Sequence, residues 1–215
     1  MNARARAAAD PLKPLRSRAW LSEARRKAIH LSFIVLPFQL LLLWLPWPRT
    51  RGEFRVVFLV LTAGAIAVDV LRIHEKRVRT FFRDFFGQMI REHERMSLLG
   101  STYLLLAALI AIEVFPLPLA AAALGYTVLG DAMGALVGKA WGRRRVFNKS
   151  LEGALGCLVA CVAWGAVVTL VGHVPWTVTL GGAVVATIVE ALPIPLDDNL
   201  GITLAAGYTM KLLAG

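Results

Sequence analysis

Long apolar runs joined by short links constrain the fold of this chain more than any other feature of its sequence. A helix needs roughly 20 residues to cross about 30 Å of hydrocarbon. We expect spans near residues 29–47, 54–71, 98–115, 117–139, 153–171 and 176–193, and a short seventh at 200–213 that fits a half-span as well as a full one. Because helices satisfy their own backbone hydrogen bonds in lipid, the sequence predicts an all-α fold, a polytopic membrane helical bundle with six to seven transmembrane helices.

Composition also indicates a membrane protein. Hydrophobic residues make up 57% of the 215 residues and charged residues 18%, whereas about a quarter of an ordinary soluble domain is charged. The short links leave no room for a separate soluble domain, so we expect one integral-membrane domain over residues 29–215. Cys157 and Cys161 lie four apart in one apolar run, which indicates packing rather than a disulfide or metal site.

The positions of Lys and Arg predict the orientation of the bundle. Residues 1–28 form a basic tail that is too long for a signal peptide's basic region, so we expect it to stay uncleaved in the cytoplasm. Residues 72–97 and the loop "GRRRVFNKS" then share that side, with Arg49, Arg51 and Arg55 as exceptions on the other. The net charge of +10 reflects topology and attraction to anionic headgroups, and we expect no nucleic-acid partner.

The segment "KRVRTFFRDFFGQMIREHER" has the pattern of an amphipathic helix. Its apolar face comprises Val78, Phe81, Phe82, Phe85, Phe86, Met89 and Ile90. Its polar face comprises Arg79, Arg83, Asp84, Arg91 and Glu92. We expect one interfacial amphipathic helix lying on the cytoplasmic surface of the membrane, with packing against the bundle as the alternative.

Acidic side chains occur near the cytoplasmic ends of the later predicted spans. Together with one carboxamide, they are Asp131, Glu152, Glu190, Asp197, Asp198 and Asn199. An ionisable group at membrane depth is costly unless it is paired or faces water, so these residues are functional candidates. The alternative is a helix-end carboxylate in interfacial water, which fits Glu152 equally well and Asp131 less well.

Glycines recur every four residues around Asp131, in "LGDAMGALVGKAWG". This stripe, at positions 130, 134, 138 and 142, predicts a face on which another helix packs closely. Gly134, Ala135 and Gly138 share one side of the helix with Asp131, so the same small side chains leave open space beside the carboxylate.

The basic loop "GRRRVFNKSLEG" follows the glycine stripe. Ser150 is a candidate N-cap for the fifth predicted span, and a helix N-terminus offers N–H groups to an anion, with Lys149 adding charge. Carboxylates beside such a loop suggest Mg²⁺ bridging a nucleotide, because magnesium combines a few carboxylates with phosphate oxygens. The nearest match to a P-loop, Gly134 to Lys139, has the wrong spacing and lacks a Ser or Thr after the lysine.

Two blocks, "GDAMGALVGKAWGRRRVFNKSLEGALG" and "VEALPIPLDDNLGITLAAG", resemble those of the CTP-dependent lipid-alcohol kinases: dolichol and polyprenol kinase, phytol kinase and fungal-type diacylglycerol kinase. "RKAIHLS" and "HERMSLLGSTYLLLAA" look like weaker blocks of this family. The resemblance implies a catalytic membrane domain that moves the γ-phosphate of CTP to the hydroxyl of a membrane lipid alcohol, with Mg²⁺ or another divalent metal. It also implies a bacterial inner (cytoplasmic) membrane location, with the active site on the cytoplasmic side.

The resemblance further implies roles for individual residues. The catalytic set is Asp131, Asp197, Asp198 and Lys149. The nucleotide-binding set is Asp131, Lys149, Ser150, Glu152, Gly153 and Asn199, and the metal-binding set is Asp131, Asp197, Asp198 and Glu190. One carboxylate, for which we favour Asp198, is expected to orient the lipid hydroxyl or accept its proton.

Other functions stay open at this point. The layout "D…G…KS.EG" also resembles part of the CDP-diacylglycerol synthase signature, and such a cytidylyltransferase would attack the α-phosphate of CTP with phosphatidate. A membrane transporter with a buried acidic site would move ions without consuming nucleotide, and an adaptor built on the amphipathic helix would tolerate loss of the acidic residues. The acceptor, whether polyprenol or dolichol, diacylglycerol or phytol, is open, as is the oligomeric state.

Four further residues have two interpretations each. Arg26 and His30 lie where the first predicted span meets the cytoplasm, and they suit either a phosphate contact or interfacial anchoring. Glu94 and Arg95, at the start of the third span, suit either support of the site or exposure to solvent.

Overall fold

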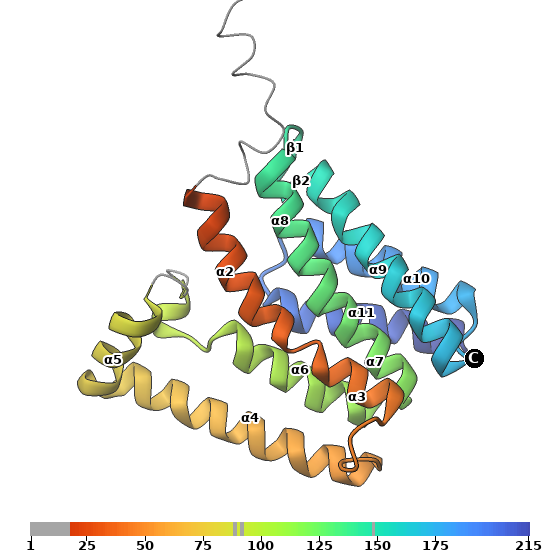
Figure 1. Cartoon of the computed structure of the whole chain (residues 1–215), viewed down its shortest axis with the longest axis horizontal. Helices are drawn as coiled ribbons and strands as arrows, with labels where there is room; N and C mark the ends of the chain where they lie inside the picture. The colour runs from red at the N-terminus through yellow and green to blue at the C-terminus, as the bar shows by residue number, and fades with distance from the viewer. Residues whose placement is uncertain (1–17, 88–89, 91–92, 148) are drawn as a thin grey trace, which may run out of the picture.

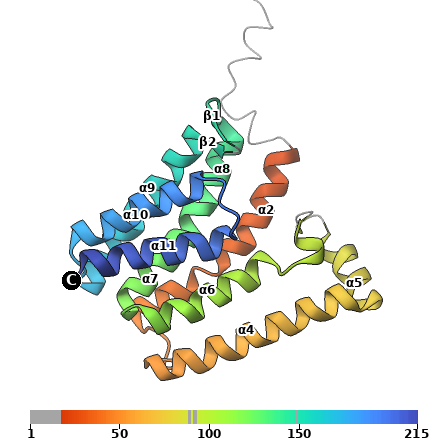
Figure 2. The same cartoon turned by 180° about the vertical axis from the view of Figure 1, so that it is seen from behind.

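The protein is almost entirely helical in the computed structural model, which describes residues 18–87, 90, 93–147 and 149–215 (Figures 1 and 2). The helices are α2 (Arg18–Ser32), α3 (Val35–Leu42), α4 (Arg51–His74), α5 (Lys76–Phe86), α6 (Gly100–Val114), α7 (Leu117–Gly125), α8 (Asp131–Trp141), α9 (Leu151–Gly172), α10 (Trp176–Ala191) and α11 (Asp198–Leu213). A 3-10 turn, η2 (His93–Met96), precedes α6, and a π-helical turn, η3 (Tyr126–Gly130), joins α7 to α8. The predicted all-α fold is confirmed.

Between α8 and α9 the chain forms a short antiparallel hairpin of β1 (Arg145–Val146) and β2 (Lys149–Ser150). Within the hairpin Val146 pairs with Lys149. The hairpin brings the basic loop back to the start of α9.

Three helical stretches among the described residues are long and apolar enough to cross a membrane: α4, the continuous stretch from α7 through α8, and α9. Two further apolar helices, α6 and α10, are shorter, with 15 and 16 residues. The predicted count of six to seven spans is therefore not confirmed by helix length and composition, although each apolar run from residue 54 onward is helical.

The predicted span at residues 29–47 is wrong as a single helix. Helix α2 ends at Ser32, the chain turns at Phe33 and Ile34, and α3 begins at Val35. Proline explains the break, because Pro37 has no N–H to donate to the carbonyl of Phe33 and its ring would clash there. Leu36 N donates to that carbonyl instead, at 3.0 Å.

The segment assigned to the basic tail divides into two parts. Residues 1–17 lie outside the described residues, whereas residues from Arg18 onward form α2, which packs along α8. Trp20 Nε1 donates to Leu136 O at 3.3 Å, and Lys139 Nζ lies 2.9 Å from Glu23 Oε2. This end of the basic segment is therefore part of the folded bundle.

The stretch from α7 through α8 is the most buried of the three long ones and lies at the centre of the fold (Figure 1). Around it, α4 packs on α6, α6 on α11, α11 on α10 and α10 on α9, which in turn packs on α8. The glycine stripe is the α8–α9 packing face: a Cβ at Gly130 would lie 2.6 Å from Cys161 Sγ, and one at Gly138 would lie 3.5 Å from Gly153 Cα. Both cysteines are buried free thiols, as the packing interpretation requires.

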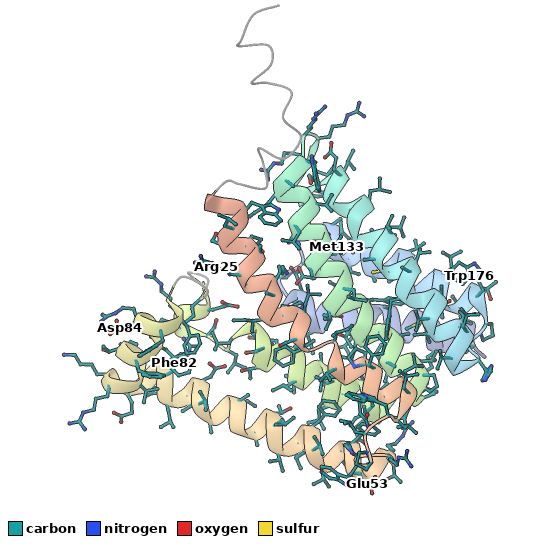
Figure 3. The ribbon with its side chains drawn as sticks, viewed as in Figure 1. Arg25, Glu53, Phe82, Asp84, Met133 and Trp176 are labelled. Carbon is teal, nitrogen blue, oxygen red and sulfur yellow. The ribbon has the colours of Figure 1, made fainter. Side chains whose placement is uncertain are left out.

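The basic segments gather at one end of the bundle. In Figure 3, Arg25 on α2 and Asp84 on α5 lie at this end, whereas Glu53 and Trp176 lie at the other. Of the three exceptional arginines, two contact the C-terminal end of α6: Arg55 Nε lies 2.5 Å from Glu113 Oε1, and Arg51 Nη2 donates to Phe115 O at 3.0 Å. Each of these two arginines is bonded to α6 within the bundle, so its position on this side of the membrane does not contradict the predicted orientation.

Helix α5 is the amphipathic helix predicted from the sequence, and it lies at the edge of the bundle beyond the end of α4 (Figures 1 and 2). Phe81 and Phe85 are exposed, whereas Phe82 is half-buried and points toward the bundle in Figure 3. The helix is shorter than the predicted segment, because α5 ends at Phe86 and Ile90, expected on its apolar face, lies in a bend. The predicted apolar face also included Met89, and the polar face Arg91 and Glu92; these three residues lie outside the described residues.

Candidate active site

Asp131 begins α8 directly after the π-helical turn and is almost fully buried. Its carboxylate forms an ion pair with Lys27 of α2, which is also buried, and Oδ2 lies 3.6 Å from His30 Nε2. His30 Nε2 is also 3.4 Å from Thr127 O, within the π-helical turn. Such turns are frequent at functional sites, and here the turn lies directly before a buried carboxylate.

Lys27 is a site residue that the sequence analysis missed, because it was counted among the basic residues of the tail. The signal was present, since Lys27 and His30 are three residues apart and therefore share one helix face. For His30, the contact with Asp131 favours a place in the site over simple interfacial anchoring.

Lys149 brings the hairpin together with two later helices. Its Nζ lies 2.8 Å from Glu190 Oε1, near the end of α10, and 3.3 Å from Asp198 Oδ2, at the start of α11. Burial disfavours the ammonium, but the negative charges of Asp198 and Glu190 outweigh that effect and raise the pKa of Lys149 above its usual value. Lys149 therefore carries its charge throughout the neutral pH range.

The start of α9 has the predicted cap but offers fewer free N–H groups than expected. Ser150 Oγ accepts from Gly153 N at 3.1 Å, which confirms Ser150 as the N-cap. Leu151 N donates to Arg144 O at 3.0 Å. An anion at this helix end would thus meet N–H groups that already have acceptors, so side-chain cations become the main source of positive charge.

Glu152 contacts the backbone of the basic loop. Its Oε2 accepts from Arg143 N at 3.0 Å and from Arg144 N at 3.3 Å. The carboxylate therefore holds the loop closed against α9, which differs from the nucleotide contact implied by the sequence resemblance.

Asp197 and Asn199 organise the start of α11. Asp197 Oδ1 accepts from Asn199 N at 2.9 Å and from Asn199 Nδ2 at 2.8 Å, so Asp197 is the N-cap of α11. Asn199 Nδ2 also donates to Gly100 O at 3.1 Å, and Gly100 N donates to Glu94 Oε1 at 3.1 Å. Asn199 thereby links α11 to α6. Of the two interpretations of Glu94, support of the site and exposure to solvent, these contacts favour support of the site.

Two hollows in the protein meet at Asp131. The first, here called the glycine hollow, has a volume of about 450 Å³. Its lining residues include Gly134, Gly138, Gly142 and Gly153 together with Arg26, Asp131, Arg145, Lys149, Ser150 and Glu190. A Cβ at Gly153 would lie 2.7 Å from Gly134 O, so these glycines permit the close approach of α8 and α9 that shapes the hollow.

The second hollow, here called the phenylalanine hollow, has a volume of about 320 Å³. Its lining residues are Arg26, Lys27, Ile29, His30, Phe33, Phe82, Phe86, Ile90, Glu94, Leu99, Gly100, Ser101, Asp131, Asp198 and Asn199. Asp131 and Arg26 line both hollows. The acidic residues and the carboxamide that the sequence grouped together are thus divided, with Glu190 on the glycine hollow and Asp198 and Asn199 on the phenylalanine hollow.

A second buried ion pair supports the phenylalanine hollow from α4, and the sequence analysis did not identify it. Arg72 Nη2 lies 3.0 Å from Asp69 Oδ1, and both side chains are almost fully buried. Arg72 also donates to the carbonyls of Glu94 and Ser97, while Asp69 Oδ2 accepts from Leu99 N. The sequence contained a signal for this pair, because Asp69 and Arg72 are opposite charges three residues apart at the end of an apolar run.

The predicted metal set does not converge in this structure. Among the residues that the structure describes, no group of three or more His, Cys, Asp and Glu side chains is close enough to hold a metal ion. Lysine ammonium groups contact the carboxylates of Asp131, Glu190 and Asp198 instead. Asp197, capping α11, lines neither of the two hollows.

Comparison with known proteins identifies the family. The chain is 25% identical over 190 residues to the uncharacterized protein RP860 of Rickettsia prowazekii, covering 85% of this chain and 90% of the relative. It is 28% identical over 166 residues to CTP-dependent diacylglycerol kinase 1 of Schizosaccharomyces pombe, covering 69% of this chain and 76% of the relative. No solved structure matches the chain. The cytidylyltransferase family model matches residues 16–193, and the chain therefore belongs to this family, consistent with the CTP-dependent lipid kinases that its motifs resemble.

Proposed function

We propose that the protein is a membrane enzyme that transfers the γ-phosphate of CTP to the hydroxyl of a membrane lipid alcohol. The observation that carries the proposal is the position of Asp131 between two hollows. One is polar and has Arg26, Lys139, Arg145 and Lys149 in its lining, and the other has a wall of phenylalanines. A phosphotransferase needs such a junction, because a charged donor and an apolar acceptor must meet at one point. The relative from Schizosaccharomyces pombe, whose name specifies CTP and diacylglycerol, supports both substrate classes.

The glycine hollow is the proposed nucleotide side. Its glycines let phosphate oxygens approach the backbone of α8 and α9 closely, and Arg26, Arg145 and Lys149 supply positive charge around them. Lys27 lies at the junction of the two hollows. Its ammonium pairs with Asp131 in this structure and can move to contact the transferred phosphoryl group during the reaction. Phosphoryl transfer depends mainly on positioning and charge neutralisation, and these cations provide both.

Mg²⁺ is the metal proposed for this reaction. Asp131, Glu190 and Asp198 offer the hard oxygen donors that magnesium uses, and one or two such carboxylates suffice when phosphate oxygens and water complete the shell. Glu190 Oε2 is buried without a hydrogen-bond partner among the described residues, so one oxygen of this set has unused capacity. When bound, the metal would neutralise charge on the nucleotide phosphates.

Asp198 is the carboxylate proposed to orient the acceptor hydroxyl and take its proton. It lines the phenylalanine hollow and at the same time contacts Lys149, which lines the glycine hollow. The proton of the hydroxyl passes to this carboxylate as the hydroxyl oxygen attacks the γ-phosphorus. CDP then leaves from the glycine hollow, and the phosphorylated lipid leaves toward the membrane.

We also place the end of the bundle that holds the site at the cytoplasmic face of the membrane. The basic segments gather at that end, and such segments are retained in the cytoplasm. The position also suits a soluble nucleotide donor, which has to reach the site from water.

A cytidylyltransferase is the second candidate, because that is the activity after which the family is named. It would use the same CTP site but join the α-phosphorus to a lipid phosphate and release pyrophosphate. The position of the label in CTP distinguishes the two reactions.

The test uses purified full-length protein in lipid nanodiscs with Mg²⁺ and CTP labelled at either the α- or the γ-phosphorus. Diacylglycerol, a polyprenol, phytol and phosphatidate are supplied in parallel. Label from γ-labelled CTP alone, in the product of one of the three alcohols, is the expected result. Label from α-labelled CTP in a phosphatidate product, with release of pyrophosphate, would instead establish the cytidylyltransferase, and absence of lipid labelling from both would refute CTP-dependent lipid chemistry.

A further inference from the structure

The structure points to a lipid-binding site, and we propose that the phenylalanine hollow holds the acceptor lipid. In this assignment the hydrocarbon chain lies against Phe33, Phe82 and Phe86, and the hydroxyl lies at Asp198 and Asn199. The assignment rests on the proposed function, since it takes this hydroxyl as the phosphate acceptor. It adds the location of the acceptor, the route by which it enters and the residues that hold it.

The hollow has the polarity that an amphiphile requires. Phenylalanines from the turn after α2 and from α5 supply its apolar wall, while Asp131, Asp198 and Asn199 supply polar groups where it meets the catalytic junction. A soluble alcohol would not need an apolar wall of this kind. A lipid with one hydroxyl at its polar end matches both parts.

Asn199 provides an acceptor that is independent of the apolar wall. Its Nδ2 donates to Asp197 Oδ1 and Gly100 O, and these two bonds fix which end of the carboxamide is nitrogen. Oδ1 is buried and has no hydrogen-bond partner among the residues that the structure describes. Buried carbonyl oxygens normally accept a hydrogen bond. The lipid hydroxyl has one proton, so it would donate to Asn199 Oδ1 on binding and turn that proton to Asp198 when it reacts.

Helix α5 gives the route. Phe82 and Phe86 line the hollow, although Phe86 is also 40% exposed, whereas Phe81 and Phe85 on the same helix do not line it and are more exposed, at 51% and 69%. An amphipathic helix with exposed phenylalanines suits the membrane interface, so the hollow would open where lipid is present. The acceptor therefore enters sideways between α2 and α5, and CTP reaches Asp131 from the other hollow.

The first experiment measures binding without turnover. The full-length protein in nanodiscs is irradiated with a diacylglycerol that carries a diazirine near the glycerol end of one acyl chain, without CTP, and labelled peptides are mapped by mass spectrometry. We expect labelling of α5 around Phe82 and Phe86 and of the turn after α2 around Phe33, reduced by excess unlabelled diacylglycerol. Labelling that excess diacylglycerol does not reduce, or that falls only on the outer surface of α8 and α9, would overturn the assignment.

The second experiment uses a matched pair of double variants on one helix. F82A/F86A should raise KM for the lipid roughly tenfold or more, because the apolar contact of two large side chains is lost, and should leave KM for CTP unchanged. F81A/F85A removes the same groups from the exposed side and should leave both constants near wild type. Equal effects of the two double variants, or a change in KM for CTP instead, would contradict the acceptor site.

The two experiments separate failure of this inference from failure of the proposed function. If the wild-type protein transfers phosphate but neither labelling nor KM singles out the hollow, the function stands and the location of the acceptor is wrong. If competed labelling falls in the hollow but CTP transfers nothing to any lipid, the binding site stands and the proposed reaction is wrong.

Discussion

Replacing Lys27 with methionine should strongly destabilise the protein. The substitution keeps the length of the side chain but removes the ammonium that pairs with Asp131. Lys27 is 2% exposed and Asp131 is 6% exposed, so the carboxylate would stay buried without its partner. Breaking a buried ion pair from one side costs about 3–5 kcal/mol. For a chain of this size, that loss lowers Tm by about 10 °C.

The reasoning also predicts how a second substitution restores stability. D131N alone leaves the Lys27 ammonium buried and should destabilise the protein comparably, whereas K27M/D131N removes both charges and should recover most of the loss. Thermal unfolding of the four proteins in one detergent, followed by circular dichroism, completes a double-mutant cycle. E113Q is the control, because it disrupts the exposed Arg55–Glu113 pair and should change Tm little. Wild-type stability of K27M, or a double variant no more stable than the single ones, would refute the buried pair.

Three further predictions concern the glycine hollow. G153A places a Cβ 2.7 Å from a backbone oxygen of α8 and should raise KM for CTP several-fold. G64A is the control, because a Cβ at Gly64 meets nothing within 4 Å, and it should leave KM for CTP unchanged. Equal effects of the two variants in steady-state kinetics would contradict this prediction. The pKa of Lys149 is raised, so its charge is complete at neutral pH and is lost only above its ordinary value. Between about pH 7.5 and about pH 9, where the terminal phosphate of CTP is also ionised, KM for CTP should therefore stay constant, and a rise within that range would count against the role of Lys149. Removal of divalent metal with EDTA should abolish transfer and added Mg²⁺ should restore it, and metal-independent transfer would exclude the proposed magnesium role.

The fold follows from the sequence where composition alone decides the structure. The runs at 54–71 and 153–171 lie within α4 and α9, because a long unbroken apolar run has few alternatives in lipid. The run at 29–47 breaks because Pro37 lacks a backbone donor, a local property that an average over apolar residues conceals. Helix α5 was predictable because its apolar residues recur with helical spacing.

The site was predictable only in part. The sequence pointed to Asp131, Lys149, Glu190 and Asp198, and the structure places them around the two connected hollows. It could not show that Lys27 is the partner of Asp131, because the two residues are 104 positions apart and their pairing depends on how α2 packs on α8. Nor could it separate Asn199 from the residues of the glycine hollow, since this division depends on the position of α6.

The measurement that tests the central claim most directly is phosphate transfer from γ-labelled CTP to diacylglycerol by K27M/D131N and by wild type in the same nanodiscs. The double variant is expected to keep its fold, so a loss of turnover would not reflect unfolding. The account predicts that kcat/KM falls by about a hundredfold or more, because the junction of the two hollows loses both charges. Turnover within a few-fold of wild type would show that the reaction takes place elsewhere and would contradict the account.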